Sequence, residues 1–248
     1  GQLQYMCSQV GLKAEQIHVI PHAAHPAYFK QLAAAHRTQL RQTLNYQDDD
    51  VVLLHIGTPA WPQGLDVLVK AFALARRQNP QLKLLLKEET GHARLRTRSQ
   101  VVQCLQGLGL YDSATLGAIC IVDDPLSLQQ LNGLYNVADA YVTPYRAESF
   151  NLPACQAQAC GTPVIATQGG ATDDFLLSEG PNRFIAGQLH AHSPQQPGPP
   201  HHAHIEPELD HLVSLLGQLG RKTSIAPVPA SDWRAPAARL LHLLSHAR

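Results

Sequence analysis

The sequence of 248 residues predicts an α/β protein built on a doubly wound, parallel sheet. Short apolar runs alternate with stretches of helical periodicity over most of the chain, and this spacing is typical of right-handed βαβ units. The run VVLLHIG is a continuous stretch of β-branched residues and leucine, as expected of a strand covered on both faces. Hydrophobic residues make up 44% of the chain and charged residues 15%, so the composition supports a packed core.

Each element follows from a local pattern. Leu65, Leu68, Val69 and Phe72 recur near helical spacing and predict an amphipathic helix, whereas Gly161 ends a later one. The predicted strands are IHVI (17–20), VVLLHIG (51–57), LKLLLK (82–87), AICIV (118–122), AYVTP (140–144) and PVIAT (163–167). The predicted helices are residues 64–77, 98–108, 126–137, 152–160, 171–177, 207–219 and 235–245. The stretch between the last strands and helices, HAHSPQQPGPPHHAH (190–204), is rich in proline and histidine and predicts a mobile loop.

The bulk composition excludes several classes of function. Lysine plus arginine equals aspartate plus glutamate, 19 against 19, which argues against a nucleic-acid binder and against purely electrostatic membrane binding. The five cysteines form no CxxC pair and predict neither a disulfide framework nor a zinc site, which favours a reducing, cytoplasmic setting. No apolar stretch is long enough to span a membrane and no signal peptide is evident, although the chain begins with Gly1 rather than methionine. Membrane association stays open.

Four loops are candidates for a binding site, because ligands of open α/β sheets bind beyond the carboxyl ends of the strands. In the first, GTPAWPQG, Gly57 and Gly64 bracket a turn whose backbone N–H groups can approach a phosphate; an ordinary turn explains them equally well. The second loop starts at Lys87, whose ammonium can neutralise a phosphate. The alternative is a solvated lysine paired with Glu88 or Glu89.

The third loop contains a carboxylate, Glu148, just before a predicted helix start at Asn151 and Pro153. The free N–H groups of that first helical turn would face the ligand edge, and the carboxylate can accept hydrogen bonds from sugar hydroxyls. A purely structural capping role for Glu148 is the alternative.

The fourth loop, TQGGATDDF, contains Asp173 and Asp174, which point to different faces of a helix and are poorly placed for a two-carboxylate hydrolase. His201, His202 and His204 lie in the proline-rich stretch without companion cysteines or helical spacing, so no metal site is predicted.

Together these stretches resemble a known family. The segments VVLLHIGTPAWPQGLDVLVKAFA, LQQLNGLYNVADAYVTPYRAESFNLPACQAQACGTPVIAT and QGGATDDF are similar to the nucleotide-binding half of GT-B glycosyltransferases. The similarity is to the retaining enzymes of family 4, the glycosyl transferases group 1 domain. It covers about residues 17–175 and extends more loosely to the last helix.

The resemblance implies a Rossmann-like sheet that forms one half of a GT-B fold and binds a nucleoside-diphosphate sugar as donor. The first glutamate of the family's E-x7-E motif contacts the donor sugar and matches Glu148, whereas Gln156 stands where a second glutamate holds the ribose. The backbone amides near Phe150, Asn151 and Leu152 would face the diphosphate. No cofactor and no metal are expected if Lys87 and the backbone N–H groups neutralise the leaving group.

Besides Gln156, two further positions depart from the family pattern. Members commonly carry a basic residue after the first glycine of the first loop and a lysine before the second, where this chain has Thr58 and Gln63. Those cations stabilise the departing diphosphate, so without them Lys87 would have to take over that role.

The resemblance also implies a division of the chain. Residues 1–45 would be the incoming segment and first strand from a missing N-terminal, acceptor-binding domain; residues 46–189 would bind the nucleotide sugar; 190–206 would be the His/Pro-rich loop and 207–248 a helical tail. The first hypothesis is a glycosyltransferase that transfers a sugar from this donor to an unknown acceptor with retention, incomplete as this chain alone. The second is a degenerate, noncatalytic nucleotide-sugar-binding or scaffolding domain, and the third an unrelated doubly wound binding domain.

Overall fold

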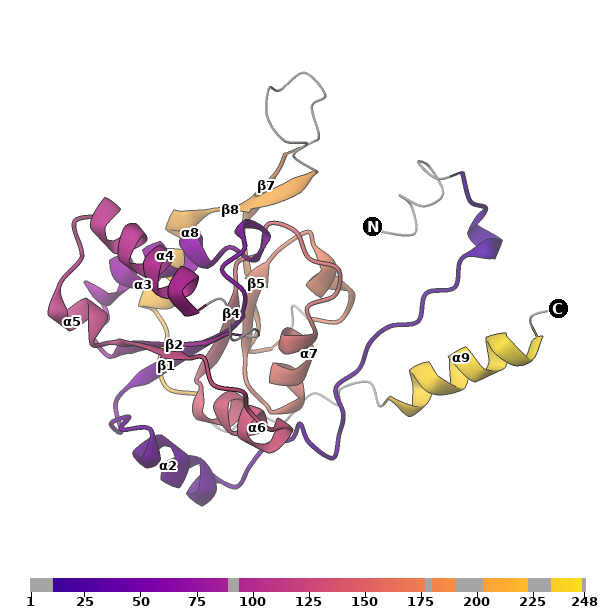
Figure 1. The fold of residues 1–248 in the computed structure, drawn as a ribbon, viewed down its shortest axis with the longest axis horizontal. Helices are drawn as coiled ribbons and strands as arrows, with labels where there is room; N and C mark the ends of the chain where they lie inside the picture. Colours follow the sequence, from indigo (N-terminus) through magenta and orange to yellow (C-terminus); the bar gives the residue numbers. More distant parts are fainter. Residues whose placement is uncertain (1–10, 89–93, 177–179, 191–202, 223–232, 247–248) are drawn as a thin grey trace.

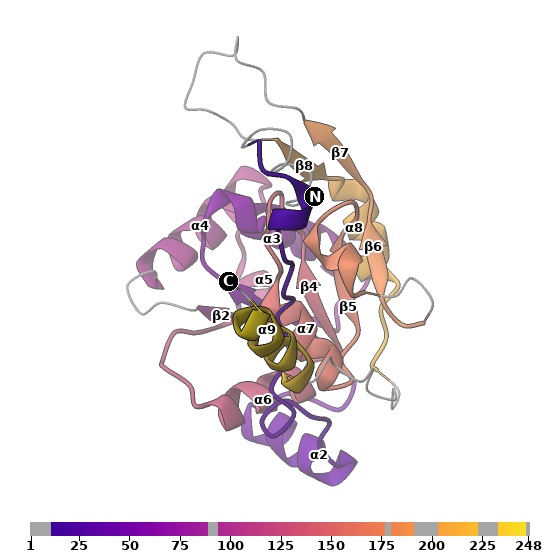
Figure 2. The same ribbon diagram turned by 90° about the vertical axis from the view of Figure 1, so that its right-hand side faces the viewer.

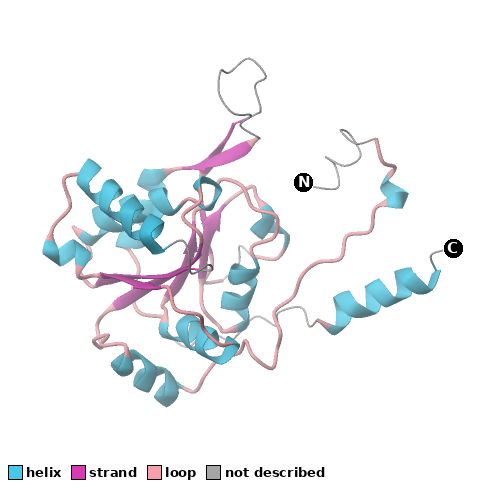
Figure 3. Ribbon diagram, in the orientation of Figure 1, coloured by secondary structure: helices cyan, strands magenta, loops and turns pink. Residues whose placement is uncertain are grey.

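The computed structural model describes residues 11–88, 94–176, 180–190, 203–222 and 233–246 (Figure 1). Within these residues a parallel sheet has the strand order β3-β2-β1-β4-β5-β6 (Figures 1 and 3). Its strands are β1 (Val51–Gly57), β2 (Leu82–Glu88), β3 (Ile119–Val122), β4 (Ala140–Thr143), β5 (Val164–Thr167) and β6 (Arg183–Ile185). The predicted fold class, an α/β doubly wound parallel sheet, is confirmed.

The strand order reverses between β1 and β4. The chain proceeds outward from β1 to β2 and β3, then returns to pair β4 with the other side of β1 and continues to β5 and β6. Loops on the two sides of this point diverge and leave room between them, which makes it the expected place for a ligand. The loops after β1, β2, β4 and β5, which the sequence singled out, all lie at this carboxyl edge.

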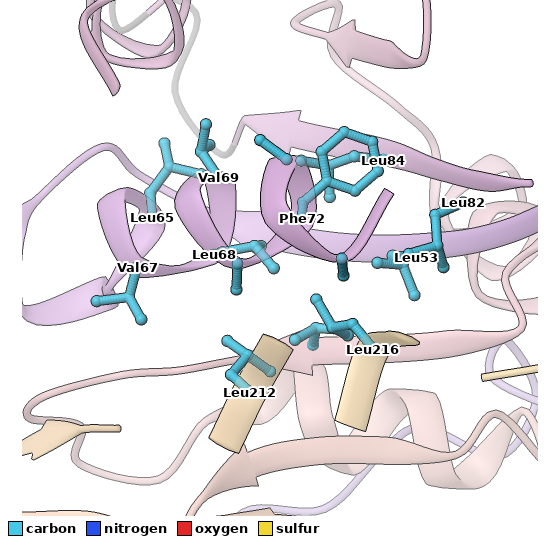
Figure 4. Close-up of a cluster of buried hydrophobic side chains, with 14 of the residues drawn as sticks. Leu53, Leu65, Val67, Leu68, Val69, Phe72, Leu82, Leu84, Leu212 and Leu216 are labelled. Carbon is cyan, nitrogen blue, oxygen red and sulfur yellow. The ribbon is translucent and has the colours of Figure 1, made fainter. Parts of the chain in front are cut away.

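Helices cover both faces of the sheet. On one face lie α3 (Leu65–Arg76), α4 (Arg94–Gly107) and α8 (Leu209–Gly217). Leu212 and Leu216 of α8 pack toward Leu68 and Phe72 of α3, and all four are buried (Figure 4). Burial of each such side chain contributes about 1.5–3 kcal/mol. The helix α8 is therefore part of the core and not an appended tail.

The opposite face is covered by α6 (Leu128–Val137) and α7 (Leu152–Ala159), with α2 (Ala34–Thr43) packed against α6. Its core includes Tyr135, Tyr141 and the alternate residues of β1 that point away from α3. The remaining short elements are η1 (Ala14–Gln16), η2 (Trp61–Gln63), α5 (Ser113–Leu116) and η3 (Ala171–Asp174).

Two regions differ from the sequence prediction. The predicted strand at residues 17–20 is wrong: the described residues before Val51 contain no strand. This segment runs apart from the sheet, where it has no neighbour to pair with, and Val19 is 54% exposed (Figure 1). The His/Pro-rich loop is shorter than predicted, because its ends form an antiparallel hairpin of β7 (Gly187–His190) and β8 (His204–Pro207). Residues 191–202, to which the prediction of mobility applies, lie outside the described residues.

The last helix, α9 (Arg234–His246), stands apart from both layers (Figures 1 and 2). Leu240, Leu241 and Leu244 are 44%, 66% and 64% exposed, and Pro236 is its buried residue. Among the described helices, none combines the length and apolar character needed to cross a membrane.

Candidate functional site

Two adjoining cavities open at the carboxyl edge, on either side of the switch point. They share Ile56, Leu152 and Pro153 as a common wall. The larger cavity, of about 340 Å³, is completed by Lys87, Glu88, Pro125, Leu126, Leu131 and Gln156. The smaller, of about 160 Å³, is completed by Gln63, Glu148 and Asn151. The large cavity is mainly apolar and the small one mainly polar, so together they suit a ligand with a flat apolar end and a polar end.

Asn151 turns the chain from the Glu148 loop into α7. Its backbone is left-handed, with φ of 67°, and its side-chain Oδ1 accepts a hydrogen bond from the N–H of Ala154 at 3.0 Å. The amide Nδ2 donates to Thr143 Oγ1 at 2.9 Å, which fixes the cap to the end of β4. The predicted helix start is confirmed, and the first turn of α7 borders both cavities.

Glu148 and Gln63 meet at the smaller cavity. The amide Nε2 of Gln63 donates to Glu148 Oε2 at 3.3 Å, and the other carboxylate oxygen accepts from the N–H of Ser149 at 2.8 Å. Neither contact saturates the carboxylate, which offers about four lone-pair positions. Glu148 is half-buried and can still accept hydrogen bonds from hydroxyl groups.

Gly57 and Gly64 hold the first loop close to its neighbours. A Cβ at Gly57 would lie 2.6 Å from Gln63 Oε1 and 3.2 Å from His55 Nε2. Gly64 has φ of 70°, and a Cβ there would lie 1.8 Å from the carbonyl oxygen of Pro144. Gly64 therefore requires glycine, for its backbone conformation as well as for space, whereas a Cβ at Gly57 would displace the flexible amide of Gln63.

Lys87 and Gln156 both line the larger cavity. The ammonium of Lys87 is buried and donates to the carbonyl oxygen of Glu88. It is therefore not the solvated lysine of the alternative interpretation. An ammonium has three donors, so two remain for a ligand. Gln156 Oε1 accepts from the hydroxyl of Tyr135 at 2.8 Å, which leaves its amide N–H groups as the donors it can offer.

Two predicted residues lie beside the cavities without lining them. Thr58 is half-buried in the loop after β1. The ring of Phe150 stacks on Phe175 at 5.0 Å and contacts His22 edge-on at 5.2 Å. Phe150 thus holds the Glu148 loop against η3 and the N-terminal segment, while Leu152 lines both cavities.

The sequence did not indicate the role of Arg146. This buried guanidinium bonds both oxygens of Asp66 at 2.8 and 2.9 Å, and both oxygens of Glu206 at 2.6 and 2.9 Å. It also donates to the carbonyl oxygen of Trp61 at 3.0 Å. Burial opposes the charge of Arg146, but these bonds outweigh it and raise its pKa. Burial likewise opposes ionisation of Asp66, yet the Arg146 contacts hold the pKa of Asp66 below its ordinary value.

His55 is a second residue that sequence reasoning missed, although a histidine within an apolar strand was a visible signal. It is buried in β1, and its Nδ1 lies 2.8 Å from the carbonyl oxygen of Val142. Burial lowers the pKa of His55 despite that bond, which favours a neutral ring with its proton on Nδ1. The Nε2 atom then carries the free lone pair and is buried beside Gly57 and Gln63 of the first loop.

The fourth loop contributes support and not ligand groups. The hydroxyl of Tyr145 lies 2.8 Å from Thr172 Oγ1 and donates to the carbonyl oxygen of Thr167 at 3.0 Å. Asp173 accepts from the N–H of Gly169 at 2.8 Å. Within the described residues no group of three histidine, cysteine or carboxylate side chains is placed to hold a metal ion. His204 lies in β8, and His201 and His202 lie outside the described residues.

The chain belongs to the family described as glycosyl transferases group 1, whose model matches residues 50–192. This confirms the resemblance to the glycosyl transferases group 1 domain. The chain is 28% identical over 172 residues to the mannosylfructose-phosphate synthase of Agrobacterium fabrum, an alignment that covers 68% of this chain and 36% of that protein.

Solved GT-B structures share the fold. The sucrose-phosphate synthase of Thermosynechococcus elongatus superposes with a TM-score of 0.68 at 23% identity, over 98% of this chain and 55% of that one. Anabaena HepE, solved in complex with UDP and glucose, gives a TM-score of 0.59 at 19% identity, over 72% of this chain and 45% of that one. The chain therefore spans about a third to a half of the length of these proteins.

Proposed function

We propose that this chain is the donor-binding, C-terminal half of a retaining glycosyltransferase, which transfers a sugar from a nucleoside-diphosphate sugar to an acceptor. The observation that carries the proposal is the pair of cavities at the switch point, one mainly apolar and one polar, joined by a shared wall. The larger, apolar cavity suits the nucleoside of such a donor, and the smaller, polar cavity suits its diphosphate and sugar.

The larger cavity suits the nucleoside. Apolar side chains of the loop before α6 and of α6 itself offer surfaces to the faces of a flat base, with Leu126 and Leu131 as the largest. At the other wall, the amide N–H groups of Gln156 can donate to ribose oxygens. An amide lacks the charge of the family's glutamate, so this hydrogen bond is weaker.

The smaller cavity suits the diphosphate and the sugar. In the first turn of α7, Pro153 has no N–H and that of Ala154 donates to Asn151 Oδ1, so Leu152 is the residue whose backbone N–H can reach a ligand. The positive end of the helix dipole also favours phosphate there. Glu148 accepts hydrogen bonds from sugar hydroxyls and Gln63 donates to phosphate or sugar oxygens. When the sugar–phosphate bond breaks, negative charge develops on the leaving diphosphate, and Lys87 is the ammonium that borders the shared wall.

Two features support assignment to one half of a larger protein. The chain spans 36% of the Agrobacterium relative and 55% of the Thermosynechococcus structure. In addition, Leu240, Leu241 and Leu244 of α9 form an exposed apolar face with no cover from the described residues. An N-terminal, acceptor-binding domain that packs on α9 would bury this face. Residues 1–45 and α9 would then connect the two domains, and residues 46–189 would hold the donor.

A noncatalytic nucleotide-sugar-binding domain is the second candidate. It is favoured by Thr58 and Gln63, which stand where the family usually places cations; among the described residues that line the two cavities, Lys87 is the one with a cationic side chain.

Titration calorimetry with UDP, GDP and ADP, each with and without magnesium, tests the donor site. One nucleotide should bind without a requirement for metal. The corresponding nucleotide sugar should bind more weakly by about tenfold to Glu148→Ala, since one hydrogen bond to a charged group is lost. The exposed carboxylate variant Asp210→Asn is the matched control and should bind as the parent does. A folded chain that binds none of the three nucleotides would contradict the proposal.

Catalysis separates the two candidates once the donor is known. Donor hydrolysis or transfer by the protein that contains both domains, reduced in Lys87→Ala, supports the enzyme. Tight donor binding without turnover in that protein supports the binding domain.

A further inference from the structure

We propose that the β7–β8 hairpin is a positioning element of the donor site, in which Glu206 acts through Arg146 to hold the carboxylate of Glu148 where it meets the sugar of the donor. This inference rests on the function proposed above, because it assigns a role at the same site. The hairpin projects from the sheet and lies between β6 and α8 in the chain (Figures 1 and 2). Its strand β8 nevertheless contacts two of the loops at the carboxyl edge.

The guanidinium of Arg146 is saturated by acceptors from three elements. Such a group has five N–H donors in a fixed plane. Nε and Nη2 donate to the carboxylate of Glu206 in β8, Nη1 and Nη2 donate to the carboxylate of Asp66 in α3, and Nη1 also donates to the carbonyl oxygen of Trp61 in η2. These bonds use all five donors and are charge-assisted at the carboxylates, so they hold this buried side chain in one orientation.

The backbone at Arg146 is held from two sides as well. On one side, the N–H groups of Arg146 and Ala147 donate to the carbonyl oxygen of Pro62 at 2.7 and 3.3 Å. On the other side, the carbonyl oxygen of Arg146 accepts from the N–H of Ile205 in β8 at 2.9 Å. Strand β8 therefore contacts both the side chain and the main chain of the residue that stands two positions before Glu148.

The side chain of Ile205 connects β8 to the loop after β5. Its Cδ1 atom lies 3.3 Å from the position that a Cβ would take at Gly169, and its Cγ2 atom lies 2.6 Å from the corresponding position at Gly187. Ile205 thus packs closely against the backbone at both glycines. Strand β8 therefore bridges the Glu148 loop and the loop after β5.

The position of the Glu148 carboxylate depends on the main chain that carries it. A group that binds a ligand hydroxyl has to be held within about 0.5 Å of its productive position. The amide of Gln63 contacts this carboxylate at 3.3 Å, which is long for a hydrogen bond. The bonds between Arg146 and Glu206, at 2.6 and 2.9 Å, are shorter and charge-assisted. Loss of Glu206 should therefore displace the carboxylate of Glu148.

Titration calorimetry on the 248-residue chain tests this role. UDP, GDP and ADP identify the base, and its diphosphate esters of glucose, galactose, mannose and N-acetylglucosamine identify the nucleotide sugar that binds most tightly. The measured quantity is the dissociation constant of that nucleotide sugar divided by that of the nucleotide. Glu148→Ala should raise this ratio by about tenfold. Glu206→Ala should raise it by about threefold to tenfold, and should change the dissociation constant of the nucleotide by less than about twofold.

A double variant shows whether Glu206 acts through Glu148. In the Glu148→Ala background the carboxylate is absent, so Glu206→Ala should change the ratio by less than about twofold. A merely structural role would lower the melting temperature and weaken both ligands alike, which leaves the ratio unchanged. Glu208→Gln removes an exposed carboxylate two residues further along and is the matched control, with the ratio of the parent.

Glu206→Gln keeps the volume of the side chain and takes the place of Glu206→Ala if that variant does not fold. A folded Glu206 variant with the ratio of the parent overturns the positioning role and leaves the donor site in place. An equal rise of the ratio with and without Glu148 does the same. A parent chain that binds no nucleotide, or a ratio that Glu148→Ala leaves unchanged, overturns the proposed donor site and the positioning role together.

Discussion

At the amino edge of the sheet Asp139 is enclosed by donors, whereas at the carboxyl edge Glu148 has capacity left for a ligand. The buried carboxylate of Asp139 accepts hydrogen bonds from Arg37 at 2.6 Å, from Arg41 at 3.0 Å, and from the N–H groups of Val52 and Lys222 at 2.8 and 3.0 Å. The carboxylate of Glu148 accepts one hydrogen bond from the amide of Gln63 and one from the backbone N–H of Ser149.

The same contrast holds for other polar atoms. In the described part of the chain, three of five buried side-chain polar atoms without a hydrogen-bond partner lie in the last three residues of strands β1, β2 and β5: His55 Nε2, Glu88 Oε2 and Thr167 Oγ1. The other two, Gln100 Oε1 and Gln158 Nε2, lie on helices α4 and α7. Saturated charges at the amino edge fasten α2 and the segment after α8 to the sheet. Unsaturated groups at the carboxyl edge leave capacity for binding. The degree of saturation, not the presence of charge, separates the structural from the functional edge.

Asp139→Ala should have the largest effect on stability. It leaves Arg37 and Arg41 partly or fully buried without their carboxylate, and loss of one partner in such a cluster costs about 3–5 kcal/mol. Urea denaturation measures the change in the free energy of unfolding. Glu148→Ala removes a carboxylate from the other edge and should cost less than about 1 kcal/mol. Equal losses for the two variants would remove the distinction between the edges.

Gly64→Ala should destabilise the chain by about 2–4 kcal/mol and distort the smaller cavity. The new Cβ meets the carbonyl oxygen of Pro144 at 1.8 Å, and the left-handed backbone disfavours any side chain. Thermal unfolding measures the loss. Gly107→Ala is the matched control, because no atom lies within 4 Å of its added Cβ and its backbone is not left-handed. A Gly64 variant as stable as the Gly107 variant would show that the two loops are not locked together.

Stability should rise between pH 8 and pH 10 because of Lys222. Burial and the nearby Arg37 lower the pKa of Lys222 to about 8, whereas the unfolded chain keeps a pKa of about 10.4. Over this interval the unfolded state binds more protons than the folded state, so raising the pH favours folding, by about 1–3 kcal/mol after allowance for partial exposure. Below about pH 8 both states bind the proton, so the contribution of Lys222 no longer changes with pH.

The difference in unfolding free energy between the parent and Lys222→Met, followed across this range, isolates the effect. A difference that does not change with pH would mean that burial and the nearby arginines do not lower the pKa of Lys222.

Lys87→Met should weaken nucleotide binding by about tenfold to a hundredfold with little loss of stability. The variant keeps the length of the side chain and removes the cation of the larger cavity, where a charge-assisted hydrogen bond contributes about 1.5–3 kcal/mol. Calorimetry measures the dissociation constant, with the exposed Arg77→Ala as the control for loss of one positive charge. Equal losses of nucleotide affinity in both variants would indicate that Lys87 acts only through long-range attraction between its charge and the nucleotide.

Gln156→Glu should have the smallest effect, an increase in nucleotide affinity of a few fold. The hydroxyl of Tyr135 can donate to a carboxylate as it does to the amide oxygen, and the second oxygen then accepts from ribose hydroxyls. Gln158→Glu, on the same helix, is the comparison. If Gln156→Glu lowered nucleotide affinity, the ribose would not lie at this wall.

Much of the fold was predictable because its strands are continuous apolar runs closed by glycine or proline. Strand β6 was missed because Arg183–Ile185 has three residues and carries an exposed arginine. The hairpin was missed because its strands are rich in histidine and border a proline-rich stretch. Residues 17–20 have the composition of a strand, yet a strand forms only where the fold places a partner beside it.

The site was predictable where its signal is local. The Asn151 cap follows from the residues at the start of α7, and the place of Lys87 follows from strand ends that meet at one edge. Arg146 could not be assigned, because its partners Asp66 and Glu206 are 80 and 60 residues away in the sequence.

Hydrogen exchange of the backbone, measured with and without the nucleotide that binds, tests the central claim most directly. The account predicts added protection at residues 56–64, 87–88, 125–131 and 148–156, with no change around Arg37, Arg41 and Asp139. Protection centred on the amino edge, or a bound nucleotide that protects neither edge, would contradict the assignment of the carboxyl edge as the donor site.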